Sequence, residues 1–169
     1  MIKTLGLILI VTSCSMMGFS MHHEMVRRLA ALKRHIAALG LIRTEIAYRN
    51  TPMGDILEAL IRDCGADTAE FYQASFAAAA SGLAFSSAAQ QNLEVLKKQG
   101  LADGDIESIQ AACRVLGQYD AGTQAEHLAA AISRLETNMQ MMQKELSAKG
   151  RIYKTAGATI GIMLALIVI

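Results

Sequence analysis

Residues 123–146 read TQAEHLAAAISRLETNMQMMQKEL, and this segment decides the fold of the chain. Its apolar residues recur at alternating steps of three and four: Ala125, Leu128, Ile132, Leu135, Met139, Met142 and Leu146. This period places one apolar stripe along a helix and is typical of a helix that packs lengthwise against a partner. We therefore predict one long helix over residues 123–153.

A second stripe of the same period occupies residues 22–48. Its members are Met25, Leu29, Leu32, Ile36, Leu39 and Ile46, with Arg43 as a polar interruption. The two helices would have nearly equal lengths of about 40 Å, since a helix rises by about 1.5 Å per residue. Matched lengths predict an antiparallel, coiled-coil-like stalk of two helices. The alternative is that each stripe only faces a globular core.

Caps and glycines divide the segment between these helices into four shorter ones. We expect them at about residues 52–63, 67–80, 86–100 and 103–119, with Thr51 as the N-cap of the first. No strand-like alternation of apolar and polar residues competes with this pattern. The predicted fold is all-α, a bundle of about six helices whose first and last members are long.

Both ends of the chain are apolar and uncharged, over residues 4–21 and 155–169. A helix of about twenty apolar residues spans a lipid bilayer. We therefore expect the stalk to continue into two transmembrane anchors, residues 1–21 and 155–169, around a helical domain of residues 22–154. Small residues at Gly157 and Gly161 suit close helix packing within lipid.

Basic residues flank each predicted anchor on the side of the central domain. They are Arg27, Arg28, Lys33 and Arg34 after the first anchor, and Lys144, Lys149, Arg151 and Lys154 before the second. Positive residues close to a span stay cytoplasmic. This pattern predicts that residues 22–154 face the cytoplasm, where the same bases would attract anionic lipids of the cell membrane.

The first apolar segment has two other interpretations. Residues 11–14, VTSC, resemble a lipoprotein processing site with Cys14 as the lipidated residue, and Lys3 before an apolar run resembles a cleavable secretory signal. Two observations favour the anchor: the apolar run continues to Met21, and the basic cluster that follows would resist export.

Composition argues against one class of protein, and the motifs give no sign of an enzyme. A net charge of +1 with few aromatic residues argues against nucleic-acid binding. Cys14, Cys64 and Cys113 are too scattered for a disulfide framework, so we expect Cys64 and Cys113 to behave as small core residues in a reducing compartment. The sequence contains no phosphate-binding loop and no nucleophile elbow.

We assign no catalytic, cofactor-binding or metal-binding residue. The triplet 103–105, DGD, lacks the remaining ligands of a calcium loop and suits a helix start better. The histidines have no Cys or His at ligand spacing, and we expect them to be interfacial or solvated: His22, His23, His35 and His127. Methionines 139, 141 and 142 suit either an adaptable partner surface or a core.

Several short motifs resemble a known family when they are taken in order. They are EIAY (45–48) with TPM (51–53), LGQYD (116–120), and KTAG (154–157) with Gly161. Together with the two apolar ends, they resemble the stage III sporulation protein AB family of endospore-forming bacteria over essentially the whole chain. Two departures from the expected pattern occur: Arg49, where we expect glycine, and Ala112-Cys113, where we expect an aromatic-glycine pair.

The resemblance implies a fold and a set of partners. That family is similar to the cytoplasmic helical domain of the type II secretion platform protein F. It implies a scaffold in the channel complex between mother cell and forespore, in the mother-cell-derived membrane around the forespore. The implied partners are the ATPase stage III sporulation protein AA and other membrane proteins of the same operon. Because the platform protein carries the domain twice, we also expect two copies of this chain to pair as a homodimer.

Overall fold

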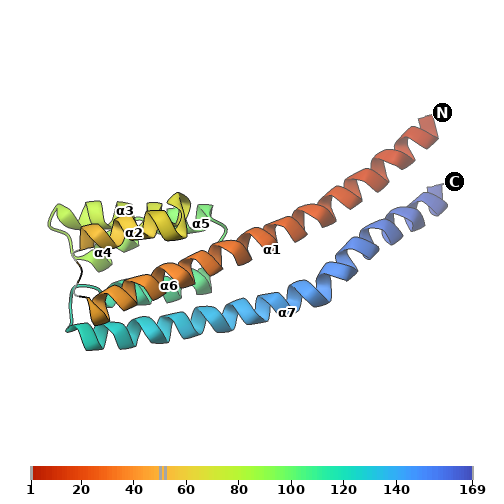
Figure 1. Ribbon diagram of the computed structural model, residues 1–169. Coiled ribbons are helices and arrows are strands. Elements are labelled where there is room, and N and C mark those ends of the chain that lie inside the picture. The colour runs from red at the N-terminus through yellow and green to blue at the C-terminus, as the bar shows by residue number, and fades with distance from the viewer. Residues whose placement is uncertain (1, 50, 52, 169) are drawn as a thin grey trace. The chain divides into compact units, whose positions relative to one another are not determined.

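The computed structural model describes the backbone of residues 2–49, 51 and 53–168, and side chains at 16, 20, 22–49, 51 and 54–148. These residues form seven helices and no strand, which confirms the all-α prediction (Figure 1). The helices are α1 (Ile2–Tyr48), α2 (Met53–Cys64), α3 (Ala66–Ala80), α4 (Phe85–Gln91), α5 (Leu93–Lys98), α6 (Asp103–Val115) and α7 (Ala121–Val168).

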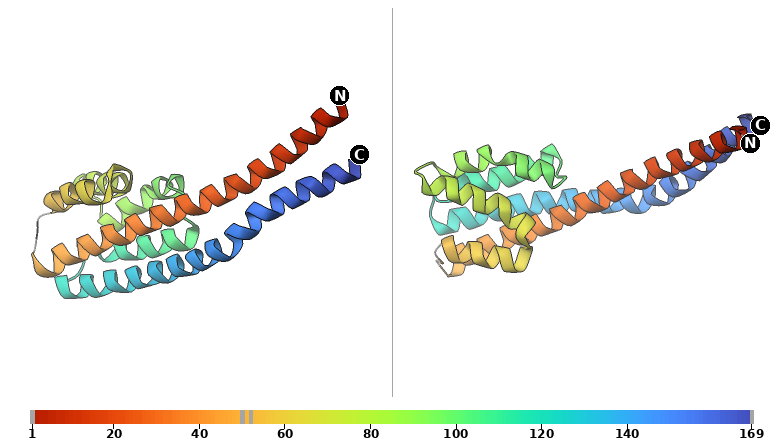
Figure 2. Two further views of the ribbon diagram at one scale, coloured as in Figure 1. Left: turned by 45° about the vertical axis from the view of Figure 1, so that its right-hand side comes forward. Right: turned by 90° about the horizontal axis from the view of Figure 1, so that it is seen from above.

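The chain divides into two compact units. One is the bundle Arg28–Gln140, and the other combines Met1–Arg27 with Met141–Ile169, the helical continuations of α1 and α7. Inside the bundle, α1 and α7 run in opposite directions with the short helices beside them (Figures 1 and 2). Helix α3 packs against α2, α4 and α5, and α6 packs against α4 and α5.

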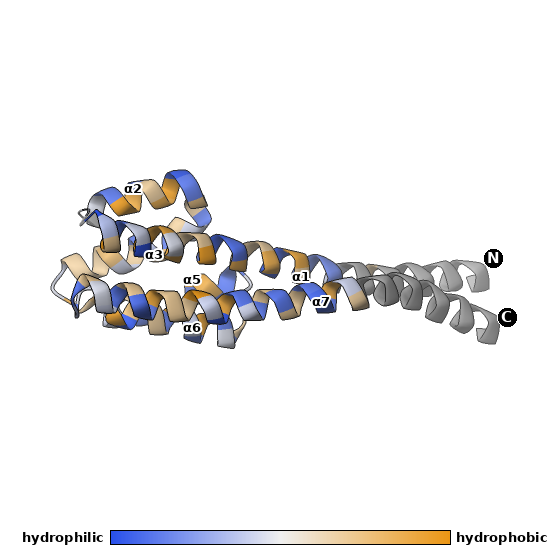
Figure 3. Cartoon of the chain, turned by 60° about the horizontal axis from the view of Figure 1, so that its bottom comes forward, coloured by the Kyte–Doolittle hydropathy of each residue, from blue (hydrophilic) through white to orange (hydrophobic). Residues whose placement is uncertain are grey.

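The apolar stripe of α7 lies where the sequence predicts it. Leu128 and Leu135 are fully buried and Met142 is nearly so, whereas Ile132 and Met139 are half-buried. Figure 3 shows hydrophobic residues alternating with hydrophilic ones along the described parts of α1 and α7. Within Arg28–Gln140, these stripes face a core that the long helices share with the short ones, because α1 contacts α3 and α6 as well.

The buried face of α1 is rotated from its predicted position. Its fully buried residues are Ala31, Leu32, His35, Ala38, Leu39 and Ile42. The predicted members Met25, Leu29, Ile36 and Ile46 are only half-buried. The face turns towards His35 and Ile42 because two alanines allow close approach there and the histidine finds buried partners.

The described residues form seven helices, whereas we predict about six, because one of the expected short helices is divided into two. The helix that we expect over residues 86–100 breaks at Asn92, which ends α4 and precedes α5. Its side-chain amide donates to the carbonyl of Ala88 (2.9 Å), a local bond that competes with helix continuation. Helix α6 ends at Val115, four residues before the predicted end, and Gly117 follows with φ of 76°.

The turn between α2 and α3 requires glycine. Gly65 has φ of 85° and ψ of 152°, a conformation that is essentially restricted to glycine. Before α2, the hydroxyl of Thr51 donates to Oε2 of Glu45 (2.5 Å), so the side chain that we predict as an N-cap bonds back to α1.

The predicted anchors, residues 1–21 and 155–169, lie outside the residues with described side chains, apart from Met16 and Ser20. Where side chains are described, no helix carries an apolar stretch long enough to cross a membrane.

Candidate functional site

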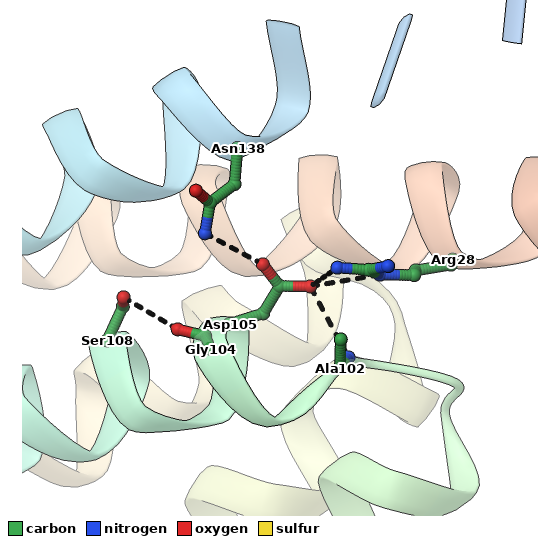
Figure 4. Close-up of polar contacts among 6 residues, drawn as sticks. All are labelled: Arg28, Ala102, Gly104, Asp105, Ser108 and Asn138. Atoms are coloured by element: carbon green, nitrogen blue, oxygen red, sulfur yellow. Dashed lines mark hydrogen bonds and ion pairs between the residues drawn. The ribbon is translucent and has the colours of Figure 1, made fainter. Parts of the chain in front are cut away.

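Three helices of the bundle meet at one buried carboxylate, that of Asp105 in the first turn of α6 (Figure 4). Its Oδ2 accepts from Nε (3.1 Å) and a terminal nitrogen (2.8 Å) of Arg28 on α1. Its Oδ1 accepts from the side-chain amide of Asn138 on α7 (3.0 Å). The backbone N–H of Ala102 donates to Oδ2 as well (3.3 Å), in the manner of a capping box.

The environment of Asp105 keeps its charge compensated. The side chain has no solvent exposure, while that of Arg28 is 35% exposed. A buried carboxylate is costly unless it is paired and hydrogen-bonded, and four donors surround this one. The position in the first turn of a helix adds favourable dipole energy. Asp105 therefore fixes the spacing of α1, α6 and α7.

A second buried network centres on His35 of α1. The ring Nε2–H donates to Oε1 of Gln99 (2.7 Å), and the hydroxyl of Tyr72 donates to Nδ1 (3.3 Å). The amide of Gln99 donates in turn to the carbonyl of Asp67. The rings of Phe71 and Tyr72 pack around the imidazole, with centroids 6.4 and 5.8 Å away. The network joins α1, α3 and the end of α5.

Burial keeps this network neutral. Desolvation lowers the pKa of His35 to about 4, against a smaller opposing effect of the hydrogen bond to Gln99. Burial also raises the pKa of Tyr72 well above its ordinary value, with further contributions from Cys113 and Cys64. A neutral imidazole suits its hydrogen bonds, since one nitrogen donates and the other accepts.

An open pocket of about 390 Å³ is lined by the start of α2, the end of α3, the start of α4 and the residues that follow α6. These parts of the helices lie at the end of the bundle where α1 ends and α7 begins (Figure 1). The pocket is lined only by apolar side chains and glycines: Gly54, Leu57, Phe76, Ala79, Ala80, Phe85, Leu116 and Gly117. The rings of Phe76 and Phe85 stack with centroids 4.3 Å apart, and Leu116 is almost fully buried. The lining offers no polar side chain for chemistry, so the pocket suits apolar contact.

Comparison with known proteins decides the family. The model of the family described as stage III sporulation protein AB matches residues 3–169. This chain belongs to the stage III sporulation protein AB family. The stage III sporulation protein AB of Bacillus subtilis (strain 168) is 23% identical over 169 residues, which cover 99% of each chain. No solved structure matches the chain.

Membership of the stage III sporulation protein AB family confirms the resemblance that the short motifs indicate. The family's description names a stage of sporulation. The two departures from the expected motif are accommodated in this member. Arg49 pairs with Glu45 one turn earlier (3.2 Å), and Ala112 and Cys113 are buried.

The structure places each residue of the candidate sites. Asp103 and Asp105 begin α6, as expected for a helix start, and no cluster of metal-ligand side chains occurs among the described residues. The solvated interpretation of His35 is wrong, because the ring is fully buried; His127 is exposed, as expected. Cys64 and Cys113 are buried free thiols, as predicted. Cys14 and Gly157 lie outside the described side chains.

The methionines that suit either a partner surface or a core lie in two different environments. Met142 is buried, while Met141 is 55% exposed. Sequence inspection missed Asp105 as a buried hub, since an aspartate in the first helical turn is ordinarily solvated. It also missed the pocket, whose lining comes from four separate segments.

Proposed function

We propose that this chain is a membrane-anchored structural component of the sporulation channel complex between mother cell and forespore. In this role it docks a cytoplasmic ATPase to the membrane assembly. The observation that carries the proposal is the family match over residues 3–169, which includes both apolar ends together with the bundle. The family description supports a role in sporulation, and the scaffold role goes beyond it.

The anchoring part of the proposal rests on the charge pattern. Both ends are uncharged over 15 to 18 residues and carry basic flanks on the side of the bundle. Met16, within the first proposed anchor, is 77% exposed, which suits a side chain that faces lipid. The chain would lie in the cell membrane, in the mother-cell-derived membrane around the forespore, with the bundle in the cytoplasm.

The docking part of the proposal rests on the bundle Arg28–Gln140. Two buried polar networks fix its helices, and its pocket leaves apolar side chains open at one end. These features suit a rigid body that presents contact surface. The proposed partners are the stage III sporulation protein AA ATPase and other membrane proteins of the same operon, with two copies of the chain pairing as a homodimer.

Capture of the ATPase tests docking. The full-length chain, purified from membranes in mild detergent, should retain the AA ATPase from the same organism in a pull-down. Leu39→Asp, which places a charge at a fully buried position, should lose it. Failure of the wild-type chain to retain the ATPase, with the helical signal of the chain intact, would sink this part of the proposal.

Protease accessibility and the mass of the mature N-terminus test anchoring. Protease added outside intact cells should leave the bundle whole, and an intact Met1 excludes lipidation at Cys14 and signal cleavage alike. Digestion of the bundle from outside would contradict a cytoplasmic domain. A mature chain that begins at a lipid-modified Cys14 would establish the alternative, a membrane lipoprotein.

A further inference from the structure

Helix α1 carries a second stripe of heptad spacing on the side opposite its buried face. This outer stripe consists of residues that recur at alternating steps of four and three: Ala30, Arg34, Ala37, Leu41, Thr44 and Tyr48. At about 100° of rotation per residue, the outer stripe points away from the fully buried Leu32, His35 and Leu39. Its spacing is typical of a helix that packs lengthwise against another helix.

Within the described part of the bundle, no helix covers the outer stripe. All its members are exposed except Leu41, which is half-buried. The buried face of α1 bonds to α3 through His35 and to α6 through Arg28, so these helices lie on the opposite side. In Figure 1, α1 runs in front of α6. A Cβ atom added at Gly40, one position before Leu41, would meet nothing within 4 Å, so the space beside the stripe is open.

The side chains of the outer stripe suit close contact with a helix. Ala30, Ala37 and Thr44 are small, and small side chains at a contact let two helix axes approach closely. Leu41 and Tyr48, one heptad apart, provide larger apolar area. Tyr48 is 85% exposed, more than any other large apolar side chain of the described residues. Tyrosine is enriched among the residues that dominate protein interfaces, so this end of the stripe can anchor a partner.

Positive charge at the other end of the outer stripe selects the occupant. Arg34 belongs to the stripe and Lys33 precedes it; both are exposed, and neither forms an ion pair with a described residue. Helix α1 has no acidic residue at positions 25–44 that could compensate them. By contrast, the exposed bases Arg62 and Lys97 each have a carboxylate partner. An acidic partner would gain ion pairs here, whereas a basic one would be repelled.

A second copy of α1 is a poor occupant of this face. In the proposed anchored arrangement, two copies of α1 leave the same membrane and run parallel. A symmetric contact between their outer stripes would place Arg34 of one copy against Arg34 of the other, with Lys33 of each nearby. Such a juxtaposition of like charges opposes association. The charge of the stripe therefore favours a different, acidic helix.

We propose that the outer stripe of α1 docks an acidic helix of a partner protein. Small and apolar side chains of that helix pack along Ala37, Leu41 and Tyr48, and its Asp or Glu residues lie beside Lys33 and Arg34. The inference rests on the proposed docking function and names the face and the chemistry of the docked segment. Leu41 and Tyr48 provide affinity, while the two bases set the charge preference and the salt dependence.

A peptide-binding experiment on the full chain tests the proposal. The chain is placed in nanodiscs of neutral phosphatidylcholine, with empty nanodiscs as the blank. The probe is a fluorescent helical peptide with a stripe of alanine and leucine flanked by glutamate, and a second probe has lysine in place of every glutamate. Anisotropy should show binding of the glutamate peptide, weakened by added salt, and little binding of the lysine peptide. Equal binding of the two peptides, or binding of neither, overturns the inference.

Charge reversal at two arginines provides the matched comparison. Arg34→Glu should weaken binding of the glutamate peptide by roughly tenfold or more and allow the lysine peptide to bind. Arg134→Glu makes the same change at an exposed arginine of α7 and should leave both results unchanged. Tyr48→Ala, at an exposed position, should weaken binding of the glutamate peptide by roughly fivefold or more. Equal binding of this peptide to Arg34→Glu and Arg134→Glu overturns the inference.

Further readouts separate this inference from the scaffold role. Binding of the glutamate peptide without capture of the ATPase supports the inference and counts against the platform proposal. Capture of the ATPase by a chain that binds neither peptide overturns the inference and leaves the platform proposal intact.

Two other occupants of the outer stripe have their own signatures. Association of the chain with phosphatidylglycerol vesicles that Arg34→Glu abolishes, without binding of the glutamate peptide, assigns the bases to anionic lipid and overturns the inference. Self-association of the chain that Tyr48→Ala abolishes, again without binding of the glutamate peptide, assigns the stripe to a second copy and overturns the inference as well.

Discussion

The guanidinium of Arg28 lies 2.8 Å from Oδ2 of Asp105, although 77 positions separate the two residues in the chain. The carboxylate is fully buried and the arginine is about one-third exposed. Removing either member of such an ion pair is costly, because the charge of the other member stays in a partly dehydrated site. The bundle therefore depends on both residues.

Asp105→Ala should destabilise the bundle by about 2–4 kcal/mol, since it removes the partner of Arg28, Asn138 and the Ala102 N–H at once. Urea unfolding of the full chain in mild detergent, followed by helical circular dichroism, measures this loss. Glu94→Ala breaks an exposed ion pair with Lys97 and should leave the midpoint unchanged. Equal midpoints for the two variants would contradict the assigned role of Asp105.

Stability should fall as the pH drops from about 6.5 to about 4 because of His35. Burial lowers its folded pKa to about 4, so over this range the unfolded chain binds a proton that the folded chain does not. The loss reaches about 3 kcal/mol, at about 1.4 kcal/mol per pH unit between the two pKa values. His35→Gln should flatten this part of the pH profile in urea titrations, whereas His127→Gln, at an exposed position, should not. Parallel profiles for wild type and His35→Gln would refute the prediction.

Ile42→Ala should cost about 1–3 kcal/mol more than Ile46→Ala. Ile42 is fully buried, so its truncation leaves a cavity, whereas Ile46 is half-buried. The comparison of urea midpoints decides between the observed face of α1 and the stripe that the sequence period predicts. A larger loss for Ile46→Ala would show that the predicted stripe is the buried one.

Gly65→Ala and Gly40→Ala should change stability in opposite directions. Gly65 occupies a backbone conformation that alanine adopts at a cost of about 1–3 kcal/mol. Gly40 lies inside α1 with free space at its Cβ position, so alanine there should gain up to about 1 kcal/mol from helix propensity. Thermal melting of both variants tests the contrast; a stabilised Gly65→Ala would disprove the strained turn.

The sequence predicts the parts of the fold that depend on local periodicity. The face of α7 follows from Leu128, Leu135 and Met142, because large apolar residues at helical spacing become buried. On α1 the same logic misplaces the face, since Ala31, His35 and Ala38 give little apolar signal. Their burial depends on α3 and the end of α5, because Tyr72 on α3 and Gln99 directly after α5 supply the hydrogen bonds that His35 needs.

The candidate sites depend on contacts between distant segments, which no local pattern contains. Asp105 resembles an ordinary helix-start carboxylate until Arg28 and Asn138 approach from two other helices. The pocket is defined by small residues, and their significance appears only when α2, α3, α4 and the end of α6 come together. The break at Asn92 is partly predictable from the sequence. The hydrogen bond from its side chain to Ala88 is local, but it competes closely with continuation of the helix.

The bonds from one carboxylate to α1 and α7 have a mechanical consequence. The two helices run in opposite directions within the bundle (Figure 1), and Asp105 holds Arg28 of one and Asn138 of the other. A slip of either helix by one turn, about 5.4 Å along its axis, would pull its side chain out of hydrogen-bonding range. Sliding is therefore opposed by hydrogen bonds to a charged carboxylate, which break abruptly rather than gradually. Tension applied along either long helix would act first on these bonds.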